Sequence, residues 1–200
     1  MTPKQIERIK GKISKIKRTL AAEKRKYGAY DDSRGMRYLP LRYFIQLQDY
    51  KGGLTYLRWF RKNFPDDMGF PDFLFEWTII LFKCGKTKEA ATKAFETFCG
   101  NTYLFDKFLG RPIIQLEKWE GSNLETPEFA EHLEYSSVDP KLADFAQWLI
   151  DLEDEREFKS HCQKYIAIEE QLKTEQDSAI RRDLSIQSRK LQSTFMKGSR

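Results

Sequence analysis

The chain has 200 residues, of which 40% are hydrophobic, 14% aromatic and 32% charged. This length and composition are typical of one folded domain, or of one domain with an appendage, and they exclude a wholly disordered chain. The net charge of +5 is uneven: residues 1–27 contain ten Lys or Arg and two Glu, a net charge of +8, so the rest carries −3. The excess positive charge therefore belongs to an N-terminal segment.

This N-terminal segment predicts an amphipathic helix that resembles one strand of a coiled coil. Its apolar side chains are spaced 3, 4, 3 and 4 residues apart, which gives a narrow seam along one face. The seam consists of Ile6, Ile9, Ile13, Ile16 and Leu20. The other faces are mostly charged, and the candidate basic-face residues are Lys4, Arg8, Lys12, Lys15 and Arg18.

Three functions are open to this basic helix. It could bind a nucleic-acid backbone, lie on an anionic membrane, or form the charged outside of a coiled-coil strand. The narrow seam favours the coiled coil, because a membrane-surface helix needs a broader apolar face with aromatic residues. We expect the seam to be buried against the second half of the C-terminal helix, or against the same element of a second chain in a homodimer. Nucleic acid is the alternative partner.

A linker is predicted at residues 28–37, where Gly, Asp and Ser are frequent. Helical hairpins are predicted over residues 38–110. We expect their helices at roughly 38–49, 51–63, 71–83, 87–99 and 102–109. Each hairpin needs a small residue where its two helices cross, because a Cβ branch there would hold the backbones apart. Gly53 and Ala90 supply it, 37 positions apart.

These hairpins resemble the tetratricopeptide repeat (TPR) family, whose units repeat at about 34 residues. Gly53, Leu57, Phe60 and Pro65 follow the order and spacing of the second helix and exit of that repeat. Residues 85–90 look like its turn between helices. The resemblance covers residues 34 to about 115 and implies an all-α fold, a TPR-like α-α superhelix of two to three hairpins.

The first helices match the family less closely. Phe44 stands where the family has Tyr and is chemically similar to it. Arg37, Pro40 and Leu41 stand where the family has Trp and the Leu-Gly pair, and they do not match those residues. A third, partial unit is predicted at residues 103–110, where Leu109 and Gly110 look like the Leu-Gly pair before the pattern stops at Pro112.

The resemblance also implies a concave groove that holds a peptide. The groove candidates carried over from the family are Arg42, Gln46, Phe75, Ile79, Lys83, Lys107 and Arg111. Four of the seven are cations, which would favour an acidic segment or a C-terminal carboxylate as the ligand. The alternative is a solvated helix face, because Lys and Arg are common wherever a helix meets water.

The last region, residues 111–200, predicts an irregular connection followed by helices. Its Pro, Gly and Ser residues leave one short helix at 127–133, and an apolar stripe predicts another helix at 140–152. From 154 to 193 there is no Gly or Pro, so a long helix is expected there, with at most one break. Its first half should pack on the domain, and its second half should project or pair with a narrow partner.

The sequence shows no catalytic or metal-binding pattern. Gly85-Lys86-Thr87 lacks the earlier glycines of a phosphate loop, and the adjacent His161 and Cys162 would point about 100° apart on a helix. Cys84, Cys99 and Cys162 are too few for a disulfide framework. We expect no enzyme, cofactor or metal, and no apolar run approaches the ~20 residues of a membrane span.

The expected location is the cytoplasm, because the basic N-terminus lacks the apolar stretch of a signal peptide. The predicted function is non-catalytic protein–protein interaction or scaffolding on TPR-like repeats, with an acidic peptide as the groove ligand. The alternative is a nucleic-acid-binding protein that uses the basic N-terminal helix.

Overall fold

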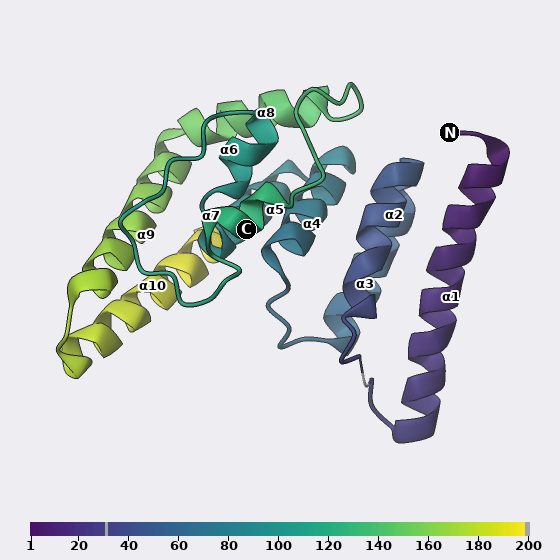
Figure 1. The fold of residues 1–200 in the computed structure, drawn as a ribbon, viewed down its shortest axis with the longest axis horizontal. Coiled ribbons are helices and arrows are strands. Elements are labelled where there is room, and N and C mark those ends of the chain that lie inside the picture. The colour runs from purple at the N-terminus through teal and green to yellow at the C-terminus, as the bar shows by residue number, and fades with distance from the viewer. Residues whose placement is uncertain (31, 199–200) are drawn as a thin grey trace.

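The computed structural model describes residues 1–30 and 32–198, with side chains described as far as Phe195. Asp31 of the predicted linker and residues 199–200 lie outside the described residues. Every regular element in the described part is helical, which confirms the predicted all-α fold (Figure 1). The elements are α1 (Pro3–Tyr27), the 3-10 helix η1 (Met36–Tyr38), α2 (Leu39–Leu47), α3 (Tyr50–Asn63), α4 (Pro71–Lys83), α5 (Thr87–Gly100), α6 (Leu104–Leu109), α7 (Pro127–Glu131), α8 (Ala143–Asp154), α9 (Arg156–Thr174) and α10 (Ser178–Gly198).

Local capping residues set several of these boundaries. Asp49 precedes α3, and its Oδ1 accepts a 2.9 Å hydrogen bond from the Gly52 N–H. Pro71 opens α4, where its missing N–H leaves no helical bond unmade. The predicted long C-terminal helix is broken once: Glu175 is extended, and Asp177 Oδ1 accepts from the first N–H groups of α10, including that of Ala179 at 2.8 Å. The predicted helix at 140–152 begins later, at Ala143.

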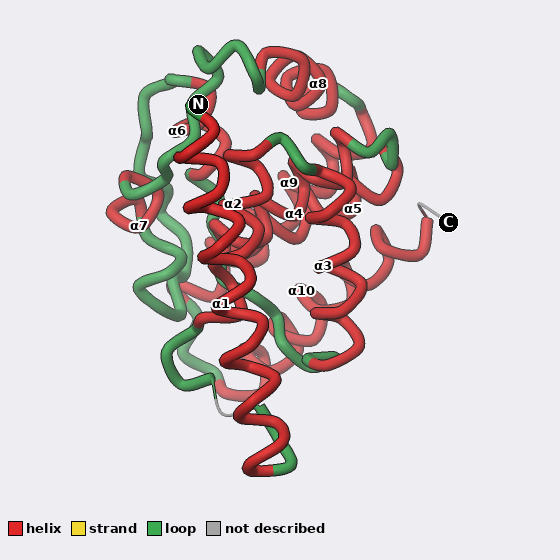
Figure 2. The backbone as a smooth tube through the Cα atoms, turned by 90° about the vertical axis from the view of Figure 1, so that its right-hand side faces the viewer, coloured by secondary structure: helices red, strands yellow, loops and turns green. Residues whose placement is uncertain are grey.

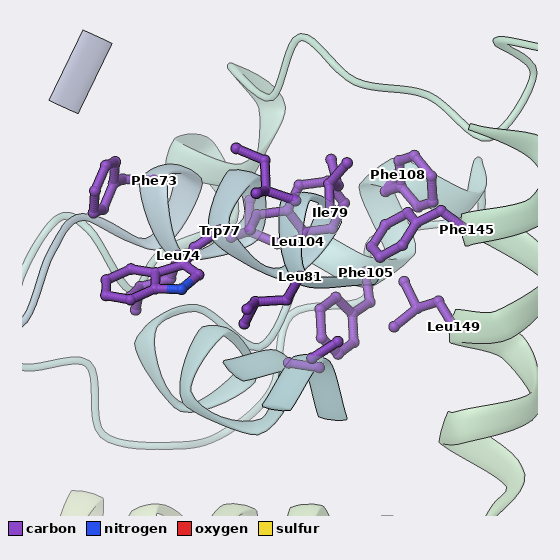
Figure 3. Close-up of a cluster of buried hydrophobic side chains, with 14 of the residues drawn as sticks. Phe73, Leu74, Trp77, Ile79, Leu81, Leu104, Phe105, Phe108, Phe145 and Leu149 are labelled. Atoms are coloured by element: carbon purple, nitrogen blue, oxygen red, sulfur yellow. The ribbon is translucent and has the colours of Figure 1, made fainter. Parts of the chain in front are cut away.

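Helix α4 is the centre of the fold. It has its most extensive contact with α5, packs against α2 and α3, and also meets α8. All its residues from Pro71 to Leu81 except Asp72 are buried, because neighbours surround the helix on every side. Figure 3 shows side chains of α6 and α8, among them Phe108 and Phe145, in the same cluster as Ile79 of α4.

The two hairpins, α2–α3 and α4–α5, approach each other closely at Gly53. A Cβ on Gly53 would lie 2.7 Å from Cδ1 of Ile80 in the second hairpin and 3.3 Å from Cβ of Phe44 in its own. Ala90 is fully buried in the α4–α5 hairpin. Gly53 therefore lies at a tight contact, where it makes room for the next hairpin as well as for its own, and Ala90 is buried inside its hairpin.

The segment predicted as a linker is held by ionic contacts. Arg37 Nε lies 2.6 Å from Asp67 Oδ2 in the turn between the hairpins, and the Tyr38 hydroxyl donates to the same carboxylate. The buried carboxylate of Asp32 accepts from the N–H groups of Met36 and Arg37. These bonds fix the path of the chain between α1 and α2.

The terminal helices do not pair with each other, contrary to the sequence-based expectation. Helix α1 packs on α2 and η1, whereas α10 packs on α9 and α5, and the two helices lie at opposite ends of the molecule (Figure 1). In the seam of α1, Ile13, Ile16 and Leu20 are buried, while Ile6 and Ile9 are half-buried. The apolar face of α2 supplies the surface that covers the buried part of the seam.

Candidate functional site

The concave face predicted to hold a peptide is filled by the chain itself. Phe75 and Ile79, predicted to line an open groove, have no exposed surface. The ring of Phe75 packs against Phe108 of α6, Phe145 of α8 and Tyr135, with centroids 5.1, 5.7 and 6.0 Å away. The two groove positions are thus part of the hydrophobic core.

The four cations predicted for this groove each pair with an acid from the C-terminal half. The pairs are Arg42–Glu134, Lys83–Asp144, Lys107–Glu131 and Arg111–Glu153. Gln46, the remaining candidate, is exposed. The acidic ligand that the sequence predicts for the groove is therefore present in the chain itself.

Sequence reasoning missed these acidic partners, although a signal for them exists. Residues 128–155 contain nine Asp or Glu and one Lys, a composition complementary to the groove cations. Charge alone could not pair them, because the connection between α6 and α8 has too little regular structure to predict its path.

A buried carboxylate anchors this covering segment. Glu76 of α4 is 3% exposed, and its Oε1 accepts a 2.7 Å hydrogen bond from the Tyr135 hydroxyl. Arg42 Nε lies 3.5 Å from the same oxygen. Burial raises the pKa of Glu76 to about 8, although the hydrogen bond from Tyr135 acts in the opposite direction. The Glu76–Tyr135 contact joins buried Glu76 of α4 to the partly buried Tyr135 of the segment after α7.

Helix α1 presents the largest set of cations that no acid neutralises. Lys4, Arg8, Lys15 and Arg18 are exposed, and none of them lies within 4.0 Å of an Asp or Glu oxygen of the described residues. Within α1, the ion pair that does form joins Lys10 to Glu7 at 3.3 Å. The outer face of α1 is thus open to solvent and strongly positive.

These four cations lie in one stripe opposite the buried seam. At 100° per residue, positions 4, 8, 15 and 18 fall on the side of α1 that faces away from Ile13, Ile16 and Leu20. Gly11 and Ala22 lie in the same stripe, and a Cβ on Gly11 would meet no atom within 4 Å. With Arg25 included, the stripe is about 32 Å long at 1.5 Å per residue. Figure 2 views the molecule from the side of α1, whose full length lies across the front.

Lys12, also predicted for the basic face, lies at its flank. Its Nζ is 5.2 Å from the ring centroid of Tyr43 in α2. Lys17 is placed similarly over Phe44 and Tyr56, at 5.6 and 5.8 Å. These cation–π contacts help to hold α1 against the hairpin, so Lys12 and Lys17 belong to the packing of α1 as well as to its charge.

Helix stability explains the charges at the C-terminal end of α1 but not those at its N-terminal end. The helix begins with a capping box, in which the Thr2 and Gln5 side chains and N–H groups bond each other, and ends at Gly28 with φ +74°. Lys24, Arg25 and Lys26 in the last turn suit the helix dipole. Its first turn contains no acid, and Lys4 stands there instead, where a cation is unfavourable. The helix dipole therefore does not account for the positive charge at the N-terminal end of α1.

The residues considered for metal or nucleophile chemistry are dispersed or buried. No group of three or more His, Cys, Asp or Glu side chains in the described chain could hold a metal ion. His161 Nδ1 bonds the Glu157 carbonyl oxygen at 2.8 Å, and burial raises the pKa of both the Cys99 and the Cys162 thiol. Among the described helices, none is both long and apolar enough to cross a bilayer.

Comparison with known proteins gives no matching family model, no matching curated protein and no matching solved structure.

Proposed function

We propose that the chain is a non-catalytic binding protein in which TPR-like hairpins hold a basic helix against a nucleic-acid backbone. The observation that carries the proposal is a contrast between two sets of cations. Those of the concave face are each paired with an acid of the same chain, whereas Lys4, Arg8, Lys15 and Arg18 of α1 have no such partner among the described residues.

The TPR-like part of the proposal is supported by the order and packing of α2–α5. Consecutive helices pair as hairpins, and the first hairpin packs on the second. Gly53 lies where the hairpins meet, and Ala90 is buried inside the second one. This arrangement gives α1 a rigid support, because the buried part of its seam rests on α2.

A phosphate backbone fits the outer face of α1 better than a protein or a membrane surface does. Protein interfaces centre on aromatic or large apolar anchors, and the stripe has none: Gly11, Ala22 and, at its edge, Glu7 lie between its cations. A membrane-surface helix inserts an apolar face, but Ile13, Ile16 and Leu20 are already buried inside this chain. A row of unpaired cations about 32 Å long matches a regularly charged polyanion.

A protein partner is the second candidate, and two exposed apolar side chains favour it. Met68 and Phe70, in the turn between the hairpins, are 78% and 42% exposed. Side chains of this kind often serve as anchors in protein interfaces. A scaffold protein would use this turn in place of the filled concave face.

The test is the salt dependence of binding to a short DNA or RNA duplex. Each phosphate contact adds about 0.9 to the slope of log K against log salt concentration. A variant with Lys4, Arg8, Lys15 and Arg18 all replaced by Gln should therefore bind more weakly and lose about 3 to 4 from the slope. The matched control replaces four exposed lysines elsewhere, Lys88, Lys141, Lys159 and Lys164, by Gln.

The control variant has the same net charge as the α1 variant, so the two separate a specific face from overall charge. Equal loss of binding in both variants, or no salt-dependent binding in the parent, would contradict the nucleic-acid proposal. Tighter binding of a poly-glutamate peptide than of the duplex, lost only in the α1 variant, would instead assign the stripe to an acidic protein.

A further inference from the structure

A second site lies far from α1, in a cavity between the C-terminal hairpin and the end of α5. The cavity has a volume of about 390 Å³. Its walls come from α4, α5, α9, α10, the turn between the hairpins and the loop at residues 119–125. Figure 1 shows α9 and α10 diverging from their connection in a V, with the long loop that precedes α7 passing close to both. The volume is within the range of small-molecule sites, about 300–1,000 Å³.

The cavity contains a buried carboxylate that forms no ion pair with a described residue. Glu169 of α9 is 7% exposed, and its Oε1 accepts a 3.0 Å hydrogen bond from the Ser188 hydroxyl of α10. Its Oε2 accepts no hydrogen bond from the described residues, and no Lys or Arg nitrogen of those residues lies within 4.0 Å of the carboxylate. A buried carboxylate without an ion pair is costly, so a cation at this place would stabilise the folded protein.

Glu125 adds a second carboxylate to the same wall. Its Oε2 accepts a 2.9 Å hydrogen bond from the Gly121 N–H, and it also forms no ion pair with a described residue. Burial raises the pKa of Glu169, and the negative charge of Glu125 adds to this effect. The two acids therefore create a region of negative potential inside the cavity.

The nearby cations are held by other groups. Lys118 Nζ donates to the Glu125 carbonyl oxygen at 3.4 Å and lies 3.5 Å from Glu120 Oε1. Arg181 Nη1 donates to the carbonyl oxygens of Leu172 and Glu175, at 2.5 and 2.9 Å. Arg189 also lines the cavity, but it is exposed. None of the three forms an ion pair with Glu169, although the positive charge of Lys118 acts against the rise in the pKa of this acid.

An aromatic ring stands at the rim of the cavity. Trp119 is 42% exposed, and the guanidinium of Arg181 lies 4.8 Å from its ring centroid. The backbone N–H of Trp119 donates a 2.8 Å hydrogen bond to the backbone carbonyl oxygen of Glu169, and this bond fixes the loop beside α9. Leu74 and Leu172 supply apolar wall surface. An acid at depth, apolar walls and an indole at the rim together suit an amine on an alkyl chain.

We propose that this cavity binds a primary alkylammonium group, with its nitrogen at Glu169 and Glu125 and its methylene chain along Leu172 and Trp119. The group has two sources, a small free amine or the side chain of a lysine in a partner protein. Both present the same ammonium on the same kind of chain, so the cavity chemistry fits either source. This site is independent of the nucleic-acid surface on α1.

The test is isothermal titration calorimetry of the full chain with n-butylammonium and, separately, with Nα-acetyl-lysine-N-methylamide, whose side-chain ammonium is free. The same titration with 1-butanol controls for the apolar chain. We expect saturable binding of one amine per chain and none of the alcohol. If the lysine derivative binds at least tenfold more tightly than butylammonium, the source of the amine is a lysine of a protein. If butylammonium binds more tightly, the source is a small free amine.

Variants of three glutamates, two in the cavity and one outside it, decide whether the cavity binds the amine. Glu169→Gln keeps a hydrogen-bond acceptor but removes the charge, and it should weaken binding of the amine at least tenfold. Glu170→Gln, at the exposed next position, should bind like the parent. Glu125→Gln, in the loop, provides an independent variant of the cavity and should weaken binding severalfold. Absence of saturable amine binding, or unchanged binding by both Glu169→Gln and Glu125→Gln, would overturn the proposal.

Discussion

The Tyr135 hydroxyl donates a 2.7 Å hydrogen bond to Oε1 of Glu76, and so joins the segment after α7 to the middle of α4 across 59 positions of the chain. The Tyr135 ring also packs on Phe75, one position before Glu76. Tyr135 therefore helps to cover the concave face, together with Phe108 and Phe145, and also satisfies the buried acid Glu76. The groove is closed by a specific polar contact as well as by apolar packing.

Replacing Tyr135 by Phe should reduce the free energy of unfolding by about 1–3 kcal/mol, because Glu76 loses its donor while remaining buried. Urea denaturation measures the change. Tyr27→Phe is the matched control, since Tyr27 is 59% exposed. If both variants unfolded at the same urea concentration as the parent, the Glu76–Tyr135 contact would contribute nothing to closing the groove.

The raised pKa of Glu76 predicts how stability changes with pH. The folded-state value of about 8 lies above the ordinary 4.5. Between these values the folded protein binds a proton that the unfolded chain lacks, so the contribution of Glu76 to stability is full at low pH and is lost as pH rises towards 8. Glu76→Gln should remove this loss. Urea midpoints of parent and variant should differ more at pH 8 than at pH 5, and a constant difference would contradict the assignment.

The tight crossing in the second hairpin predicts a cost for larger side chains. Ala90→Leu should destabilise the protein by about 1–3 kcal/mol, because the extra carbons have no space in the packed core. Ala22→Leu changes the same residue type on the exposed face of α1 and should have little effect. Thermal unfolding of the two variants gives the comparison, and an unchanged melt for Ala90→Leu would show that the hairpin crosses elsewhere.

The Lys83–Asp144 pair should be energetically modest. Lys83 Nζ lies 2.5 Å from Asp144 Oδ1, but the Asp144 side chain is 61% exposed. Such exposed ion pairs contribute about 0.2–1 kcal/mol to the free energy of unfolding. A double-mutant cycle with Lys83→Ala and Asp144→Ala measures the coupling. High salt should reduce it, and a coupling well above this range would mean that α8 is held to α4 by charge more than by the packing of Phe145.

Much of the helix content follows from local signals in the sequence. The narrow seam, the capping residues and the prolines place α1, α3, α4 and α5 close to their observed ends, because these signals act within one or two turns. The break between α9 and α10 has a local cause in Asp177, which caps the second helix. No Gly or Pro marks the break, so the sequence indicated it only weakly.

What covers each apolar face could not be predicted in the same way. Phe75 and Ile79 lie on a face that the TPR resemblance leaves open, and their cover comes from residues about 30 to 70 positions away, such as Phe108 and Phe145. The sequence-based expectation paired the seam of α1 with the C-terminal helix or a second chain, whereas the seam packs on α2, the next α-helix in the chain. Apolar patterns show that a face will be buried, but they do not identify the surface that buries it.

The position of α1 at one end of the molecule makes its attachment separable from the core. It packs mainly on α2 and η1, and its many like charges repel one another along the exposed stripe. Local unfolding should therefore release α1 long before α4 opens, and its amide hydrogens should exchange sooner. Under the proposed function, a bound polyanion would cancel the repulsion, so that the docked helix and its partner would stabilise each other and binding would tighten the N-terminal end of the protein.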